Sequence, residues 1–131
     1  MKLPPEAHVA IVDGEKFLLM QNRGTALSRK LQSEGTPDVA LENKSAGTRH
    51  QDGRGEEPLQ KFAHAAGVAE WLNKAVLDRR IEQLLVIADP DTLGEMRAHY
   101  DKRLESALIG ELNRQLTGMH GPDIAKAIAA A

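Results

Sequence analysis

The chain has 131 residues, of which 41% are hydrophobic and 27% are charged, and its formal net charge is −2. This length is sufficient for one domain with its own core, and the composition is that of a soluble globular protein. The nearly balanced charge provides no overall attraction to nucleic acid or membranes, so such binding would need a local basic patch. The absence of cysteine excludes disulfides, thiol nucleophiles and Cys-ligated metals. The start of the chain lacks the apolar segment of a signal peptide and no apolar run is long enough to span a membrane, so we expect a cytoplasmic protein without membrane insertion.

The first part of the chain predicts an antiparallel meander of three strands. Residues 8–13 and 16–21 are rich in apolar and β-branched side chains. Asp13-Gly14 lies between them, a dipeptide that favours a tight hairpin turn because both residues tolerate positive φ. Residues 26–34 alternate loosely between apolar and polar side chains, which predicts a third strand after a turn at residues 22–24.

Residues 35–57 differ in composition from the rest of the chain, with four glycines and few large apolar side chains. Loops of this length are usually functional or disordered, so we expect a long flexible loop. Its basic side chains could contact RNA phosphates, while glycine keeps the backbone accessible. The alternative is a solvated loop without a ligand. The candidate nucleic-acid-binding residues are Lys44, Arg49, His50, Gln51 and Arg54.

Helical spacing begins at Pro58, which suits the first position of a helix, and one apolar face continues to about Arg79. The next apolar run, at residues 83–88, is too short for a buried helix and predicts a strand covered on both faces. This run stops at Asp89-Pro90, because proline disfavours a helical conformation in the residue before it.

Thr92 and Glu95 have capping-box spacing, which predicts the start of a helix at Thr92. Its apolar face continues to Leu108. Residues 109–117 fit either a continuation of that helix or a strand, and we favour a final strand. A last short helix is expected from Pro122.

The resulting order is β-β-β-loop-α-β-α-β-α, the order of ribonuclease-H-like sheets. We therefore expect a single α/β domain over residues 1–131, with a mixed sheet of about five strands. The right-handed crossover rule places the strand at residues 83–88 beside the first strand. Ligands of open α/β sheets bind at the carboxyl ends of such strands.

Two aspartates, Asp13 and Asp89, would follow adjacent strands at that edge. Paired carboxylates there could hold Mg²⁺ for phosphodiester hydrolysis, but no third acidic ligand can be assigned by spacing, and the turn and the loop already account for both. The histidines form no helical ligand pair and no Gly-x-Ser-x-Gly motif occurs, so no metal, cofactor or catalytic residue is assigned. The candidate cleft residues are Asp13, Asp89, Thr92, Arg97 and His99.

Four segments, at residues 8–16, 47–50, 69–73 and 88–95, resemble the bacterial host-attachment protein family. Its members are small proteins described as required for attachment to host cells, and the resemblance covers essentially the whole chain. That family is in turn similar to the middle domain of the archaeal and eukaryotic class 1 release factors. The resemblance implies an α/β sheet with a long loop after the third strand.

In release factors this loop carries Gly-Gly-Gln and enters the ribosomal peptidyl-transferase centre. The corresponding segment here contains Gln51 but not the glycine pair that allows close backbone approach to a substrate. We therefore expect a non-enzymatic module that contacts RNA or the ribosome through residues 44–54. The alternatives are a peptidyl-tRNA hydrolase and a protein–protein interaction domain that acts indirectly in host attachment.

Overall fold

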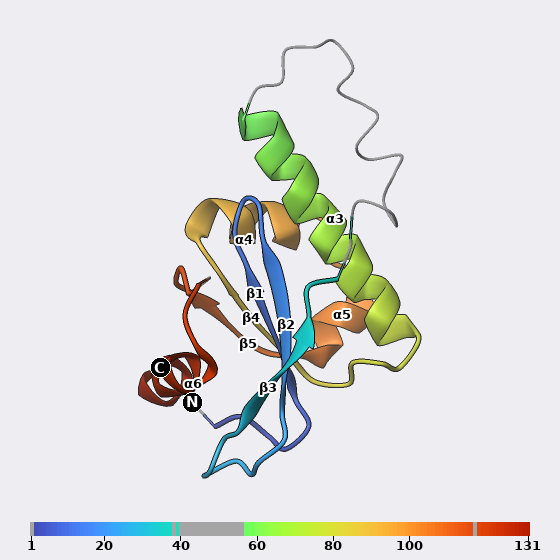
Figure 1. Cartoon of the computed structure of the whole chain (residues 1–131). Coiled ribbons are helices and arrows are strands. Elements are labelled where there is room, and N and C mark those ends of the chain that lie inside the picture. The colour runs from blue at the N-terminus through green and yellow to red at the C-terminus, as the bar shows by residue number, and fades with distance from the viewer. Residues whose placement is uncertain (1, 38, 40–56, 117) are drawn as a thin grey trace.

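The structure, a computed structural model, describes residues 2–37, 39, 57–116 and 118–131. It contains one open sheet of five strands in the order β3-β2-β1-β4-β5, with helices on both faces (Figure 1). The strands are β1 (His8–Val12), β2 (Phe17–Asn22), β3 (Leu31–Gly35), β4 (Leu84–Ala88) and β5 (Leu108–Asn113), and the helices are α3 (Glu57–Leu77), α4 (Pro90–Arg97), α5 (Lys102–Ala107) and α6 (Gly121–Ala130).

The pairing of the strands confirms the predicted mixed sheet. Strand β2 is antiparallel to both β1 and β3, whereas β4 is parallel to β1 and β5 is parallel to β4. The register aligns His8 with Leu84 and Val12 with Ala88. The strand predicted at residues 83–88 therefore lies beside the first strand, as the crossover rule requires.

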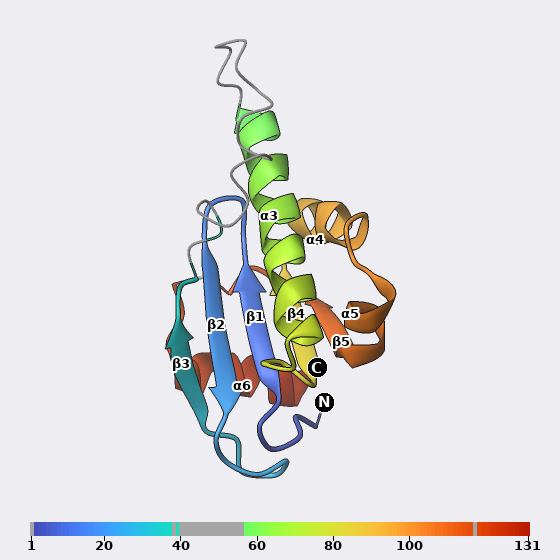
Figure 2. The same ribbon diagram turned by 90° about the vertical axis from the view of Figure 1, so that its right-hand side faces the viewer.

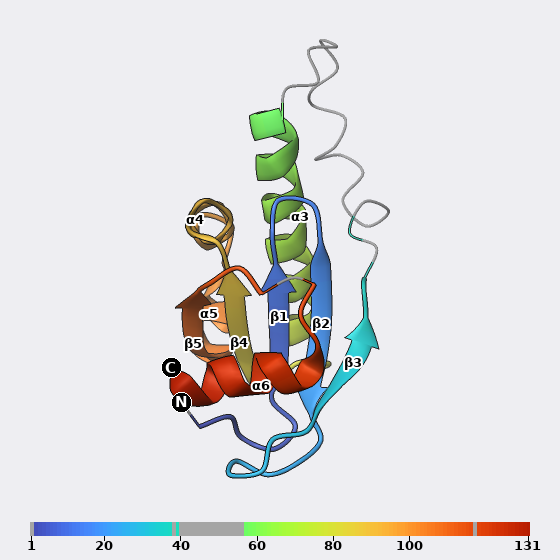
Figure 3. The same ribbon diagram turned by 60° about the vertical axis from the view of Figure 1, so that its left-hand side comes forward.

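The sheet separates two apolar layers (Figures 2 and 3). Helices α3, α4 and α5 cover one face, where Ala10 and Val86 are buried, and α6 crosses the other, where Val9 and Leu85 are buried. Every residue of β4 is fully buried. Strands that are covered on both faces read as continuous apolar runs, which explains the sequence of β4.

Helix α3 confirms the long helix predicted from Pro58, and its apolar face packs on the sheet. Trp71 lies at the edge of this packing and forms a T-shaped pair with Phe17, with 5.4 Å between the ring centroids. The guanidinium carbon of Arg80 lies over the Trp71 ring, 5.1 Å from the ring centroid. These contacts make Trp71 part of the core boundary.

The hairpin and its tight turn are confirmed, but the turn does not use the positive φ that the sequence suggested. Val12 pairs with Phe17, and the Asp13 N–H donates to the Lys16 carbonyl at 3.0 Å, so only Gly14 and Glu15 lie between that bonded pair. Neither Asp13 nor Gly14 has a positive φ. The carboxylate of Asp13 instead accepts the backbone N–H groups of Glu15 and Lys16 at 2.7 and 2.6 Å. A side chain that closes its own turn removes the need for the left-handed conformation.

The third strand is shorter than predicted and begins at Leu31 rather than residue 26. The reason is the buried side chain of Asn22, whose oxygen accepts the N–H groups of Gly24 and Lys30 and whose amide donates to the carbonyls of Leu3, Pro4 and Thr25. These bonds hold the chain in a wide loop before β3. A Cβ at Gly24 would lie 2.1 Å from the Ser28 carbonyl oxygen, so only glycine fits there.

The structure has two helices where one was predicted from Thr92 to Leu108. The first of them begins three residues earlier than predicted, because its N-cap is Asp89 and not Thr92. Asp89 is the N-cap of α4, with Pro90 at the first helical position. A second cap, Asp101, accepts the Leu104 N–H at 2.8 Å and starts α5. Both short helices bury apolar side chains in the same layer as α3, among them Leu93, Met96 and Leu104.

The ambiguous residues 109–117 include strand β5, so the prediction of a final strand is confirmed. The last helix, α6, also follows the prediction, with Ile124 and Ile128 buried against the sheet. Within the described part of the chain, no helix has both the length and the apolar character needed to cross a membrane.

Candidate functional site

The carboxyl ends of β1 and β4 bring the two predicted aspartates to one edge of the sheet. Val12 and Ala88 are register partners, and Asp13 and Asp89 follow them directly. Their predicted placement after adjacent strands is therefore observed. The Asp13 carboxylate is occupied by the two backbone N–H groups of its own turn.

Asp89 holds the start of α4. One carboxylate oxygen accepts the Thr92 hydroxyl at 2.7 Å, and the other accepts the Thr92 N–H at 3.3 Å. Thr92 is buried, with 1% of its surface exposed, so its hydroxyl has a structural partner in Asp89. A carboxylate that caps a helix satisfies backbone donors and complements the helix dipole.

No group of three or more His, Cys, Asp or Glu side chains that could hold a metal ion occurs among the described residues. The hydrogen bonds of Asp13 and Asp89 give both carboxylates a structural role, because Asp13 closes the turn after β1 and Asp89 caps the helix after β4.

Arg97 belongs to a second polar cluster, which joins α4 to β5. Its guanidinium donates from Nη2 and Nε to one oxygen of Glu111 at 2.8 and 3.0 Å, and the Tyr100 hydroxyl donates to the other oxygen at 3.2 Å. Burial, followed by the negative charge of Glu111, raises the pKa of Tyr100. The hydrogen bond and charge of Glu111 likewise raise the pKa of Arg97. Both side chains therefore keep their protons and donate to Glu111.

His99 lies near this cluster in the connection between α4 and α5. Its ring Nε2 is 3.0 Å from a carboxylate oxygen of Glu95. Asn73 of α3 fastens the same connection, because its amide donates to the His99 carbonyl at 2.8 Å and its oxygen accepts the Asp101 N–H at 3.2 Å. These bonds fix the turn that separates the two short helices.

The structure thus divides the predicted cleft residues between two clusters. Asp13, Asp89 and Thr92 lie at the ends of β1 and β4, whereas Arg97 and His99 belong to the polar contacts around Glu111 and Glu95. Sequence reasoning did not select Glu111, although a single charged side chain between Gly110 and Leu112 in a predicted strand was the available signal. The five residues of the predicted nucleic-acid-binding segment, Lys44, Arg49, His50, Gln51 and Arg54, lie outside the described residues.

Residues 6–128 match the family described as bacterial archaeo-eukaryotic release factor family 12. The chain belongs to this family. The match includes all five strands, the segment at residues 44–54 and most of α6. A comparison with curated proteins finds no match.

Membership of release factor family 12 confirms the release-factor-like part of the resemblance seen in the sequence. Attachment to host cells stays a prediction.

Proposed function

We propose that this protein is a non-enzymatic binding module that contacts RNA or the ribosome through the basic segment at residues 44–54. The observation that carries the proposal is the release factor family match, which extends over this segment. Such a protein would act in the cytoplasm. An effect on attachment to host cells would then be an indirect consequence of its binding.

The residue types in the segment suit phosphate recognition. Lys44, Arg49 and Arg54 are closely spaced cations, and Gly47 and Gly53 leave the neighbouring backbone accessible. Because the whole chain has a net charge of −2, the attraction must be local. Binding should therefore weaken steeply with added salt, as counterions compete for the phosphates.

Peptidyl-tRNA hydrolysis is the enzymatic alternative within the same family context. Arg49 and His50 precede Gln51, where the release factor motif has two glycines. Side chains at these two positions restrict the backbone and its approach to a scissile ester. We therefore expect binding without release of free tRNA.

The test is co-sedimentation of the purified protein with 70S ribosomes across a series of salt concentrations. The informative variant is Arg49→Ala/His50→Ala/Arg54→Ala, and the matched control is Lys30→Ala/Lys126→Ala, at exposed positions outside the segment. Each change takes the formal net charge from −2 to −4. A parallel assay follows the release of free tRNA from purified peptidyl-tRNA.

The proposal predicts salt-sensitive binding that the segment variant loses and the control retains. If both arginines contact phosphates, the slope of log affinity against log salt should fall by about 2 in the variant. Equal loss in both variants, or no binding at low salt, would overturn the proposal and favour a protein partner. Release of free tRNA by the wild type alone would establish the hydrolase alternative instead.

A further inference from the structure

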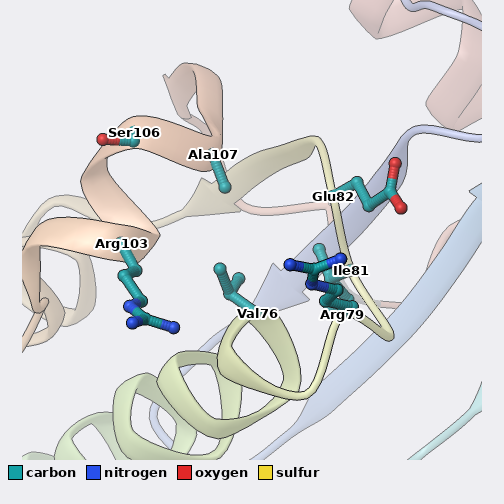
Figure 4. Close-up of a pocket in the computed structure, with 7 residues that line it drawn as sticks. All are labelled: Val76, Arg79, Ile81, Glu82, Arg103, Ser106 and Ala107. Carbon is teal, nitrogen blue, oxygen red and sulfur yellow. The ribbon is translucent and has the colours of Figure 1, made fainter.

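A pocket of about 360 Å³ lies at the amino ends of β4 and β5, the opposite edge of the sheet from Asp13 and Asp89 (Figure 4). The end of α3, the connection to β4 and helix α5 surround it. Val76, Ile81 and Ala107 form an apolar wall. Neither the family match nor the sequence motifs assign a role to this pocket.

Two arginines at the pocket have no polar partner among the described residues. Figure 4 shows that Arg79 and Arg103 project from two sides toward the space beside Val76, while the carboxylate of Glu82 turns away from it. The two side chains form no hydrogen bond or ion pair with the residues that the structure describes. Arg80 differs, because it stacks on Trp71 and lies 3.9 Å from Asp78.

The backbone at Arg79 is in the left-handed region, with φ of 62°. This residue follows the end of α3, where its N–H bonds to the Val76 carbonyl at 3.0 Å and the next N–H bonds to the Ala75 carbonyl at 2.9 Å. Glycine is the preferred residue in this type of helix end, because a side chain is unfavourable at positive φ. Arginine at this position is costly for the fold, and local strain of this kind occurs preferentially at binding sites.

We propose that this pocket binds the phosphate group of a nucleotide. Guanidinium groups match phosphate oxygens in geometry and charge, and two of them converge here without a competing carboxylate between them. The volume is within the range of small-molecule sites, and the apolar wall suits a base or sugar attached to the phosphate. The phosphate can belong to a free nucleotide or to the end of an RNA strand.

The test is an NMR titration of the full chain with two probes, ADP and a 5′-phosphorylated hexauridylate. The backbone amide signals of Ile81, Arg103 and Ala107 report on the pocket. Arg79→Gln/Arg103→Gln removes the two guanidiniums. Lys74→Gln/Lys102→Gln is the matched control, since it also removes two positive charges, from exposed positions of α3 and α5 that do not line the pocket.

Saturable shifts at the three amides, with affinity at least about tenfold weaker in the arginine variant and changed less than about twofold in the control, would support the proposal. A response to ADP identifies a free nucleotide, and a response to the hexauridylate alone identifies an RNA end. Equal weakening in both variants, shifts located elsewhere, or no saturation with either probe would overturn it.

A second variant separates binding from folding. Arg79→Gly relieves the left-handed backbone, so Tm should rise while nucleotide affinity falls. A rise in Tm with unchanged affinity would show that the Arg79 side chain is not a ligand and would overturn the proposal. These measurements involve no ribosome and do not depend on the function proposed for residues 44–54.

Discussion

His8 is a buried titratable side chain at the start of β1, with 6% of its surface exposed. Its Nε2 lies 3.8 Å from a Glu34 oxygen, and its Nδ1 is buried without a hydrogen-bond partner among the described atoms. Burial lowers the pKa of His8, an effect that the charge of Glu34 opposes and that of Arg23 reinforces. The folded state therefore favours the neutral ring.

This environment predicts that acid destabilises the protein through His8. In the unfolded chain His8 binds a proton near pH 6.5, and in the folded chain it does so only at lower pH. The contribution of the neutral His8 to folding stability is therefore fully present above pH 6.5, and it is lost as pH falls through that value toward the folded pKa. Urea denaturation at pH 7.5 and pH 5 measures the loss. The decrease in the free energy of unfolding between the two pH values should be smaller in His8→Gln than in the wild type. An equal decrease in the variant would exclude His8 as a cause.

Asp89 is the other informative single residue, because it caps α4 and accepts the buried Thr92 hydroxyl. Asp89→Ala leaves that hydroxyl unpaired and should lower the free energy of unfolding by about 1–3 kcal/mol. Asp123→Ala, in the first turn of α6, changes an acidic residue that is not a cap and should lower it by less than about 1 kcal/mol. Equal effects in urea titrations would show that the cap is unimportant.

At the scale of elements, the connection between α4 and α5 is held from three directions. Asn73 reaches it from α3, Glu111 from β5 through Arg97 and Tyr100, and Asp101 from within the connection itself. The apolar spacing of residues 93–108 is compatible with one helix, so periodicity alone does not reveal the break. The break depends on polar partners that are distant in sequence.

Asn73→Ala should therefore destabilise this connection selectively. Losing two hydrogen bonds to the backbone of His99 and Asp101 should cost about 1–2 kcal/mol in the free energy of unfolding. Hydrogen exchange should accelerate at residues 99–104 more than in β4. Asn113→Ala, at the exposed end of β5, is the control, and uniform acceleration in both variants would contradict a local role for Asn73.

At the scale of the whole molecule, stability depends on a sheet whose central strands are buried on both faces. The layer under α3 includes Leu72, which is fully buried, whereas Leu77 of the same helix is 53% exposed. Replacing either leucine by alanine removes the same atoms, from a buried position at Leu72 and from an exposed one at Leu77.

Leu72→Ala should lower the free energy of unfolding by about 2–5 kcal/mol, because it removes buried surface and leaves a cavity. Leu77→Ala should lower it by less than about 1 kcal/mol. Urea denaturation followed by Trp71 fluorescence and by circular dichroism measures both. Similar losses in the two variants would contradict the packing of α3 on the sheet.

Some features of the candidate sites could be predicted from the sequence, and others could not. The adjacency of Asp13 and Asp89 follows from strand order, which the hydrophobic pattern and the crossover rule predict. Their hydrogen bonds to Lys16 and Thr92 depend on local geometry. The convergence of Arg79 and Arg103 could not be predicted, because it depends on how α5 packs against the end of α3.

The sequence by itself determined the order of the strands and the two-sided burial of β4, because apolar periodicity encodes them directly. The resemblance to a release-factor-like family came from four short segments of the sequence. Tertiary structure decided the late start of β3, the division of residues 92–108 into two helices and the arginine pair at the pocket. The physical reason is that Asn22 and Asn73 act through hydrogen-bond partners that only folding brings within range. Arg79 and Arg103 likewise lie at one pocket only because α5 packs beside the end of α3.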